Sequence, residues 1–132
     1  MPRHRIVYLV LAAALTTLVT VTFLIAPEGD EEVLPEPLRM VRPLPGDIVT
    51  RQAEVEIGLP VGYSIELYVD GRRVPGHEIV AREPTGRFSW KPAPGGWMER
   101  WEAGERTLRL VWDRTTGGRP DPGEFEWRFR VQ

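Results

Sequence analysis

The segment from Ile6 to Ala26 contains 21 residues and no charged side chain. In an α-helix, which rises about 1.5 Å per residue, a run of this length spans the hydrocarbon core of a bilayer, roughly 30 Å thick. The apolar part of a secretory signal is usually shorter, about 7–15 residues, and ends in small residues. Here the run ends in Leu24, Ile25, Ala26 and Pro27, which is a poor cleavage site. We therefore expect a permanent transmembrane helix over residues 6–26.

The charges that flank this helix predict its orientation. Arg3 and Arg5 precede the apolar run, and every Asp and Glu follows it. Because positive residues near a membrane span stay on the cytoplasmic side, we expect residues 1–5 to form a cytoplasmic tip. The protein would then be a single-pass protein of the cell (plasma) membrane, with its C-terminal domain extracytoplasmic and the lipid bilayer as a binding partner.

Residues 27–38 are acidic and rich in proline. They contain no basic residue, three prolines and five acids, namely Glu28, Asp30, Glu31, Glu32 and Glu36. Such a composition buries too little apolar surface to fold, and its like charges repel one another. We expect an extended linker between the membrane and a folded domain.

Within the predicted helix, Ala12, Thr16 and Thr20 recur every four residues and form a stripe of small, weakly polar side chains. Such a stripe lets a second membrane helix approach closely. Alternatively, each threonine bonds the carbonyl four residues earlier and simply faces lipid. If the first reading holds, the stripe contacts a membrane protein partner.

From residue 39 onward, apolar and polar residues alternate in short runs. The clearest is EFEWRFRV near the C-terminus; others are AEVEIGL, YSIELYVDG, RFSWK and RTLRLVWD. Alternation with a period of two gives a strand one buried and one solvated face, as in antiparallel sheets. About seven such strands predict an all-β fold, an Ig-like antiparallel β-sandwich over residues 39–132. Trp90, Trp112 and Trp127 are expected in its core.

Several motifs are similar to those of bacterial Ig-like extracytoplasmic domains. They are the opening RPLPGDIV, the hairpin YVDGRRV, then FSWKPAPG, WEAGERTLRLVWDRTTGG and the closing FEWRFRV, which together cover about residues 40–131. The resemblance implies a sandwich fold, and such domains serve as spacers, adhesive modules and accessory subunits. A related group with the same opening binds copper through His and Met. That role does not carry over, because the His and Met residues of the segment 39–132 are only His77, Met40 and Met98.

The sequence offers few groups for catalysis. Cysteine is absent, which excludes disulfides and thiolate zinc sites, and His77 is the single histidine after the apolar run. We therefore expect no enzyme, no cofactor and no metal. Asp113, Asp121 and Glu124 are candidate ligands for calcium, but their spacing matches no known calcium loop.

The charge balance argues against a nucleic-acid partner. From Arg39 onward the chain holds 14 acids and 15 bases, without the clustered basic face that nucleic-acid binding requires.

The segment KPAPGGWMERWEAG, residues 91–104, is the candidate for partner binding. It concentrates Trp97, Met98, Arg100 and Trp101, and Trp, Met and Arg are enriched at interfaces. Trp101 could instead fill the end of the sandwich, and Trp97 could be either packed or exposed.

These features predict a membrane-anchored, non-catalytic interaction module, an accessory subunit of a membrane protein complex. The alternative is a cell-envelope glycan-binding or adhesive module that uses Trp97, Trp101 and nearby arginine side chains.

Overall fold

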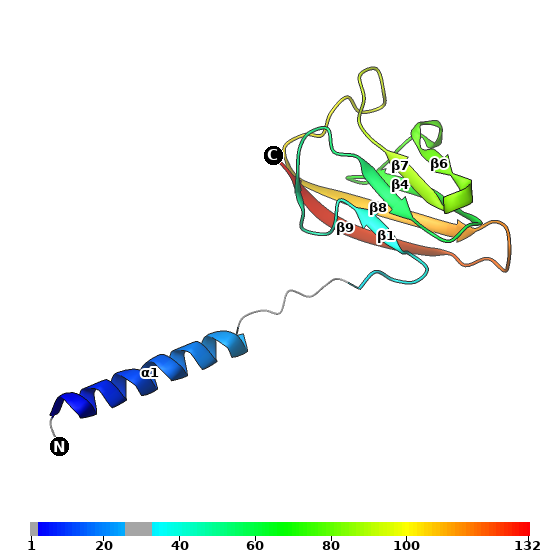
Figure 1. The fold of residues 1–132 in the computed structure, drawn as a ribbon. Helices are drawn as coiled ribbons and strands as arrows, with labels where there is room; N and C mark the ends of the chain where they lie inside the picture. The colour runs from blue at the N-terminus through cyan, green and yellow to red at the C-terminus, as the bar shows by residue number, and fades with distance from the viewer. Residues whose placement is uncertain (1–2, 26–32) are drawn as a thin grey trace. The chain divides into compact units, whose positions relative to one another are not determined.

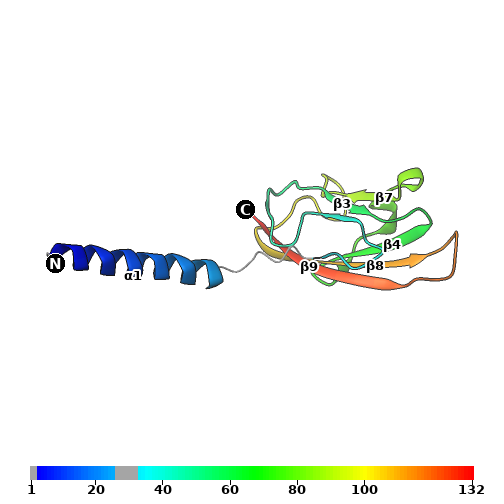
Figure 2. The same ribbon diagram turned by 60° about the horizontal axis from the view of Figure 1, so that its bottom comes forward.

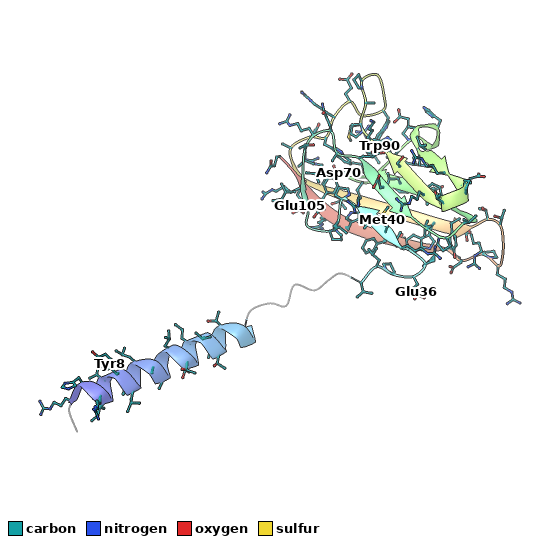
Figure 3. All side chains as sticks on the ribbon, in the orientation of Figure 1. Tyr8, Glu36, Met40, Asp70, Trp90 and Glu105 are labelled. Carbon is teal, nitrogen blue, oxygen red and sulfur yellow. The ribbon has the colours of Figure 1, made fainter. Side chains whose placement is uncertain are left out.

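The computed structural model describes residues 3–25 and 33–132 (Figure 1). The chain divides into two compact units, and the second comprises Leu34–Gln132. The first unit contains helix α1 (Arg3–Ile25), which is long and apolar enough to cross a membrane. Figure 3 shows Tyr8 among the side chains that project outward from this helix. Tyr8 is 70% exposed. The acidic part of the predicted linker, residues 27–32, and the last residue of the predicted helix, Ala26, lie outside the described residues.

The second unit is a two-layered β domain. Residues 33–132 form nine strands, of which seven have three or more residues. One sheet has the order β1 (Met40–Arg42), β3 (Val55–Gly58), β7 (Arg87–Trp90), β6 (Val80–Arg82). The other has the order β2 (Ile48–Val49), β9 (Gly123–Val131), β8 (Gly104–Arg114), β4 (Tyr63–Val69), β5 (Arg72–Arg73). Figure 2 shows β3 and β7 in one layer and β4, β8 and β9 in the other. Two short 3-10 turns, η1 (Gly76–Glu78) and η2 (Glu83–Thr85), flank β6. The prediction of an all-β domain built from two sheets is confirmed.

The alternating sequence pattern sets which side chains enter the core. Along β8, Leu108, Leu110 and Trp112 are buried while the residues between them are more exposed. Antiparallel pairing aligns Leu108 with Trp127 on β9, so both strands turn their apolar residues to the same face. Trp90, Trp112 and Trp127 are each 3% exposed, which confirms their predicted place in the core.

One strand departs from the predicted antiparallel arrangement. β2 pairs with β9 in the parallel sense, with Ile48 opposite Arg130 and Val49 opposite Val131. The reason lies in the connection: the chain leaves β1 through Pro43–Asp47 and crosses to the other sheet, where Gly46 N–H donates to Arg128 O. Strands that switch sheets in this way form the corners of sandwiches.

Buried indole groups are hydrogen-bonded to segments that are distant in the sequence. Trp127 Nε1 donates to Pro43 O at 2.9 Å, and Trp101 Nε1 donates to Ala53 O at 2.9 Å. A buried N–H without a partner would be costly, so these bonds tie the segments before β2 and β3 to the core.

The first and last residues of the β domain lie at opposite ends of the sandwich. Leu38 is 5% exposed and Leu34 packs against the core, so the last residues of the predicted linker belong to the domain. Glu36–Arg39 lie beside Arg114 and Asp121, where β8 leads into the β8–β9 loop. Gln132 instead bonds Val49 O at 3.0 Å, and Figure 1 shows the C-terminus beside the yellow loop that precedes β8.

Truncation of Trp127 tests the importance of this core. We expect Trp127→Ala to lower the free energy of unfolding by about 3–5 kcal/mol, the range for large buried aromatics. Glu126→Ala, at an exposed position of the same strand, should change it by less than about 0.5 kcal/mol. Denaturant unfolding of the full chain in detergent measures both. Equal effects of the two substitutions would show that the register of β9 is wrong.

Candidate functional site

The β7–β8 loop, residues 91–103, is the candidate site. It turns back on itself: Gly96 N–H donates to Ala93 O at 3.0 Å and Ala93 N–H donates to Met98 O at 3.0 Å. Gly95 has a φ of 78°, a left-handed conformation that glycine adopts without strain. The Pro-Gly-Gly sequence therefore forms a tight turn that presents Trp97 and Met98.

A chain of aromatic rings connects this loop to the core. Trp97 meets Trp90 edge to face at 6.1 Å, Trp90 meets Trp101 at 5.5 Å, and Trp101 meets Phe129 at 5.1 Å. Such T-shaped pairs contribute about 0.5–1.5 kcal/mol each beyond the area they bury. The loop is thus held by packing, and Trp97 is half-buried.

The carboxylate of Glu78 ties three elements together. Its Oε1 accepts the Trp97 backbone N–H at 2.7 Å, and its Oε2 accepts the Trp90 indole N–H at 3.2 Å. These two bonds, the first above all, hold the pKa of Glu78 below its ordinary value because they stabilise the ionised form. η1, β7 and the β7–β8 loop therefore share one charged acceptor.

An open groove of about 420 Å³ lies against this loop. Its lining includes Arg51, Arg72, Trp97, Met98, Glu99 and Arg100. Within residues 33–132, none of its three guanidinium groups forms an ion pair with a carboxylate. The Arg72 guanidinium lies over the Trp97 ring, 5.2 Å from its centroid, a favourable cation–π contact.

The predicted site residues fall into three groups. Arg100 is exposed, and Trp97 and Met98 are partly buried and pack against the core. Trp101 is 0% exposed, so its inclusion among residues that a partner touches is wrong: it fills the end of the sandwich.

Sequence reasoning missed Arg51, Arg72 and Glu78. Arg72 follows the hairpin turn at Asp70 and Gly71, and this signal predicts that it pairs beside β4 but not that it lies over Trp97. Nothing in the local pattern marks Glu78 as an acceptor.

The threonine hydroxyl groups of the Ala12–Thr16–Thr20 stripe donate hydrogen bonds to backbone carbonyls of α1 itself. Thr16 Oγ1 donates to Ala12 O and Thr20 Oγ1 donates to Thr16 O, both at 2.8 Å. The hydroxyl oxygens keep their lone pairs as acceptors. A contact of this stripe with another helix stays a prediction.

The three carboxylates that were candidate calcium ligands each contact a different group of the protein. Asp121 Oδ2 accepts the Tyr63 hydroxyl at 2.6 Å, Asp113 Oδ1 accepts the Asp121 N–H, and Glu124 pairs with Arg109. Among the residues that the structure describes, no group of three or more His, Cys, Asp or Glu side chains could hold a metal ion.

Comparison with known proteins identifies a likeness of fold. No protein family and no curated protein matches this chain. Among solved structures, it is similar to the endo-beta-1,4-mannanase from Thermotoga petrophila, with a TM-score of 0.52 and 14% identity. The match covers 77% of this chain and 21% of the mannanase chain, so this chain spans about a fifth of that protein. At this identity the likeness concerns the fold alone and carries no information on catalysis.

The role of Glu78 predicts a pH dependence. Because its folded pKa is depressed, its contribution to stability is present above its unfolded pKa, about 4.3, and is lost as pH falls through the lower folded value. We expect Glu78→Gln to be less stable than the unmodified chain at pH 7, with the difference shrinking below about pH 4. Thermal unfolding of both chains across this pH range measures the difference. A difference independent of pH would mean that the charge of Glu78 is not what holds the loop.

Proposed function

We propose that this chain is a single-pass membrane protein whose external Ig-like domain is a non-catalytic interaction module, an accessory subunit of a membrane protein complex. The observation that carries the proposal is the groove at the β7–β8 loop. Met98 and Arg100 lie on this loop, which is fixed by packing, and the guanidinium groups of Arg51 and Arg72 line the same groove from other segments. Binding residues are usually carried on loops that a rigid scaffold positions, and such a loop loses little conformational entropy on binding.

In this proposal, helix α1 is a permanent anchor with its N-terminus in the cytoplasm. The length and hydropathy of α1 support it, as do the positions of Arg3 and Arg5 before the apolar run and of every acid after it. The Ala12–Thr16–Thr20 stripe is the proposed contact with the membrane-embedded part of the partner.

The outer face of the larger sheet supports the choice of the loop over this sheet. On the outer face of the larger sheet, Arg109 pairs with Glu124 at 3.1 Å and Arg128 pairs with Glu105 at 3.2 Å. These exposed charges neutralise one another, and such pairs are typical of solvated surfaces.

A glycan-binding or adhesive module is the second candidate, supported by the half-buried Trp97 at the edge of the groove. Aromatic side chains bind sugars through their ring faces, and Arg72 covers a face of Trp97. A sugar would therefore have to displace this guanidinium. Binding of purified cell-wall polymer to the full chain, strengthened by Arg72→Ala, would favour this candidate over the first.

The topology is tested in intact spheroplasts. We expect protease added to spheroplasts to remove the domain, because the proposed topology has residues 27–132 on the outer side of the membrane. Mass measurement of the purified protein should find residues up to Ala26 retained. A domain protected from protease, or a mature chain that begins between Ala14 and Glu31, would contradict the anchor.

The groove is tested by co-purification from detergent-solubilised membranes. We expect Arg100→Ala and Arg51→Ala each to weaken association with a membrane protein partner by about tenfold or more, as interface arginines commonly do. Arg130→Ala, at an exposed position of β9, is the matched control and should leave association unchanged. All three should melt like the unmodified chain.

The stripe is examined in the same experiment by comparing Thr16→Val with Thr17→Val, which removes a hydroxyl beside the stripe. Recovery of the chain alone, with no membrane protein bound, would count against the accessory-subunit proposal.

A further inference from the structure

One edge of the sandwich is open, where β4 of the larger sheet faces β6 of the smaller one. β5 covers only the end of β4, pairing with Tyr68 and Val69. The chain then leaves the sheet at Pro75 and forms η1. β6 is the last strand of its own sheet. The first half of β4 therefore has a strand neighbour on one side only.

The hydrogen-bond pattern shows which backbone groups this leaves unpaired. Thr115 N–H donates to Gly62 O and Asp70 N–H donates to Thr107 O, so the even-numbered residues of β4 bond to β8. The odd-numbered ones face the opposite side, where Val74 N–H donates to Leu67 O. At Tyr63 and Ile65 that side has no strand within residues 33–132. Their N–H and C=O groups form an unpaired edge.

An apolar hollow lies directly beside this edge. Its volume is about 380 Å³, and its apolar lining consists of Val61, Ile65, Ile79, Ala81 and Phe88. Ile65 points inward, since it lies on the same face of β4 as the buried Tyr63 and Leu67. Ile65 and Phe88 are nevertheless only partly buried. The hollow thus reaches the outer part of the core. A cavity of about 150 Å³ holds a benzene molecule, so there is room for two apolar side chains.

We propose that this edge binds an extended segment of a partner protein, which adds to the larger sheet as a strand alongside β4. Backbone bonds to Tyr63 and Ile65 would hold it, and two apolar side chains at alternate positions would enter the hollow, as in other strand-addition complexes. Glu83 is the charged residue of the lining and forms no ion pair within residues 33–132. A basic residue beside the apolar pair complements it.

The size of the edge favours a peptide over a second copy of this chain. The free part of β4 from Tyr63 to Ile65 spans roughly 7–10 Å at about 3.3 Å per residue. Stable dimers bury on the order of 1,200–2,000 Å², which an isologous contact over so short an edge does not provide. This surface is separate from the β7–β8 loop, and the inference does not depend on the proposed function.

Amide hydrogen exchange of the full chain in detergent micelles tests the proposal. The probe is a short capped peptide in which valine alternates with threonine and lysine follows the last valine. In the free chain, the amides of Tyr63 and Ile65 should exchange faster than those of Ser64 and Glu66. With the peptide at about ten times its Kd, they should exchange about tenfold more slowly. The same peptide with N-methyl groups on the amides that face β4 should give no protection.

Two substitutions on adjacent residues of β6 provide the matched control. Ala81→Trp fills the hollow, whereas Val80→Trp places the same ring on the opposite face of the strand. The first should weaken peptide binding at least tenfold and the second should leave it unchanged.

Three results would overturn the proposal: no protection by the peptide at millimolar concentration, equal binding by both variants, or equal protection by the N-methylated peptide. A dimer that Ala81→Trp dissociates would assign the edge to a second copy instead.

Discussion

The buried indole N–H groups of Trp90, Trp101 and Trp127 each require an acceptor, and this requirement ties the connecting segments to the core. The acceptors of Trp90, Trp101 and Trp127 lie in three separate connecting segments, at Glu78, Ala53 and Pro43. Since cysteine is absent, no covalent link fixes these segments. Core packing and the indole bonds therefore determine the path of the chain between the strands.

The candidate groove depends on the same arrangement. Trp97 lies at the outer end of the aromatic chain that continues through Trp90 and Trp101 to Phe129. Glu78 bonds the backbone of Trp97 and the indole of Trp90 together. A loop with two consecutive glycines would otherwise sample many conformations. Here its exposed Arg100 is presented from a fixed base, which limits the entropy lost when a partner binds.

Period-two alternation was sufficient to predict the longer strands and their buried faces, because side-chain burial imposes that period on β4, β8 and β9. It did not predict β2 or β5, since two residues carry no periodicity. Nor could it predict the parallel pairing of β2, which depends on where the chain crosses between sheets. Burial of Leu38 and partial burial of Leu34 were missed because the short segment that carries them is rich in proline and has no alternating pattern.

The candidate site was predictable in part. The loop's composition marked Trp97, Met98 and Arg100, but the arginines contributed by other segments depend on tertiary packing. The open edge at β4 was not predictable either, because a strand at an edge and a strand inside a sheet have the same alternating pattern.

The placement of the chain ends within the domain has a practical consequence. β8 has 11 residues and runs from the groove end of the sandwich to the end where Glu36–Arg39 lie, about 33 Å at roughly 3.3 Å per residue. Gln132 lies at the groove end, where its carbonyl accepts Arg51 Nε at 3.4 Å. A fluorescent protein or affinity tag fused after Gln132 would emerge beside Arg51 and compete with any ligand for that space.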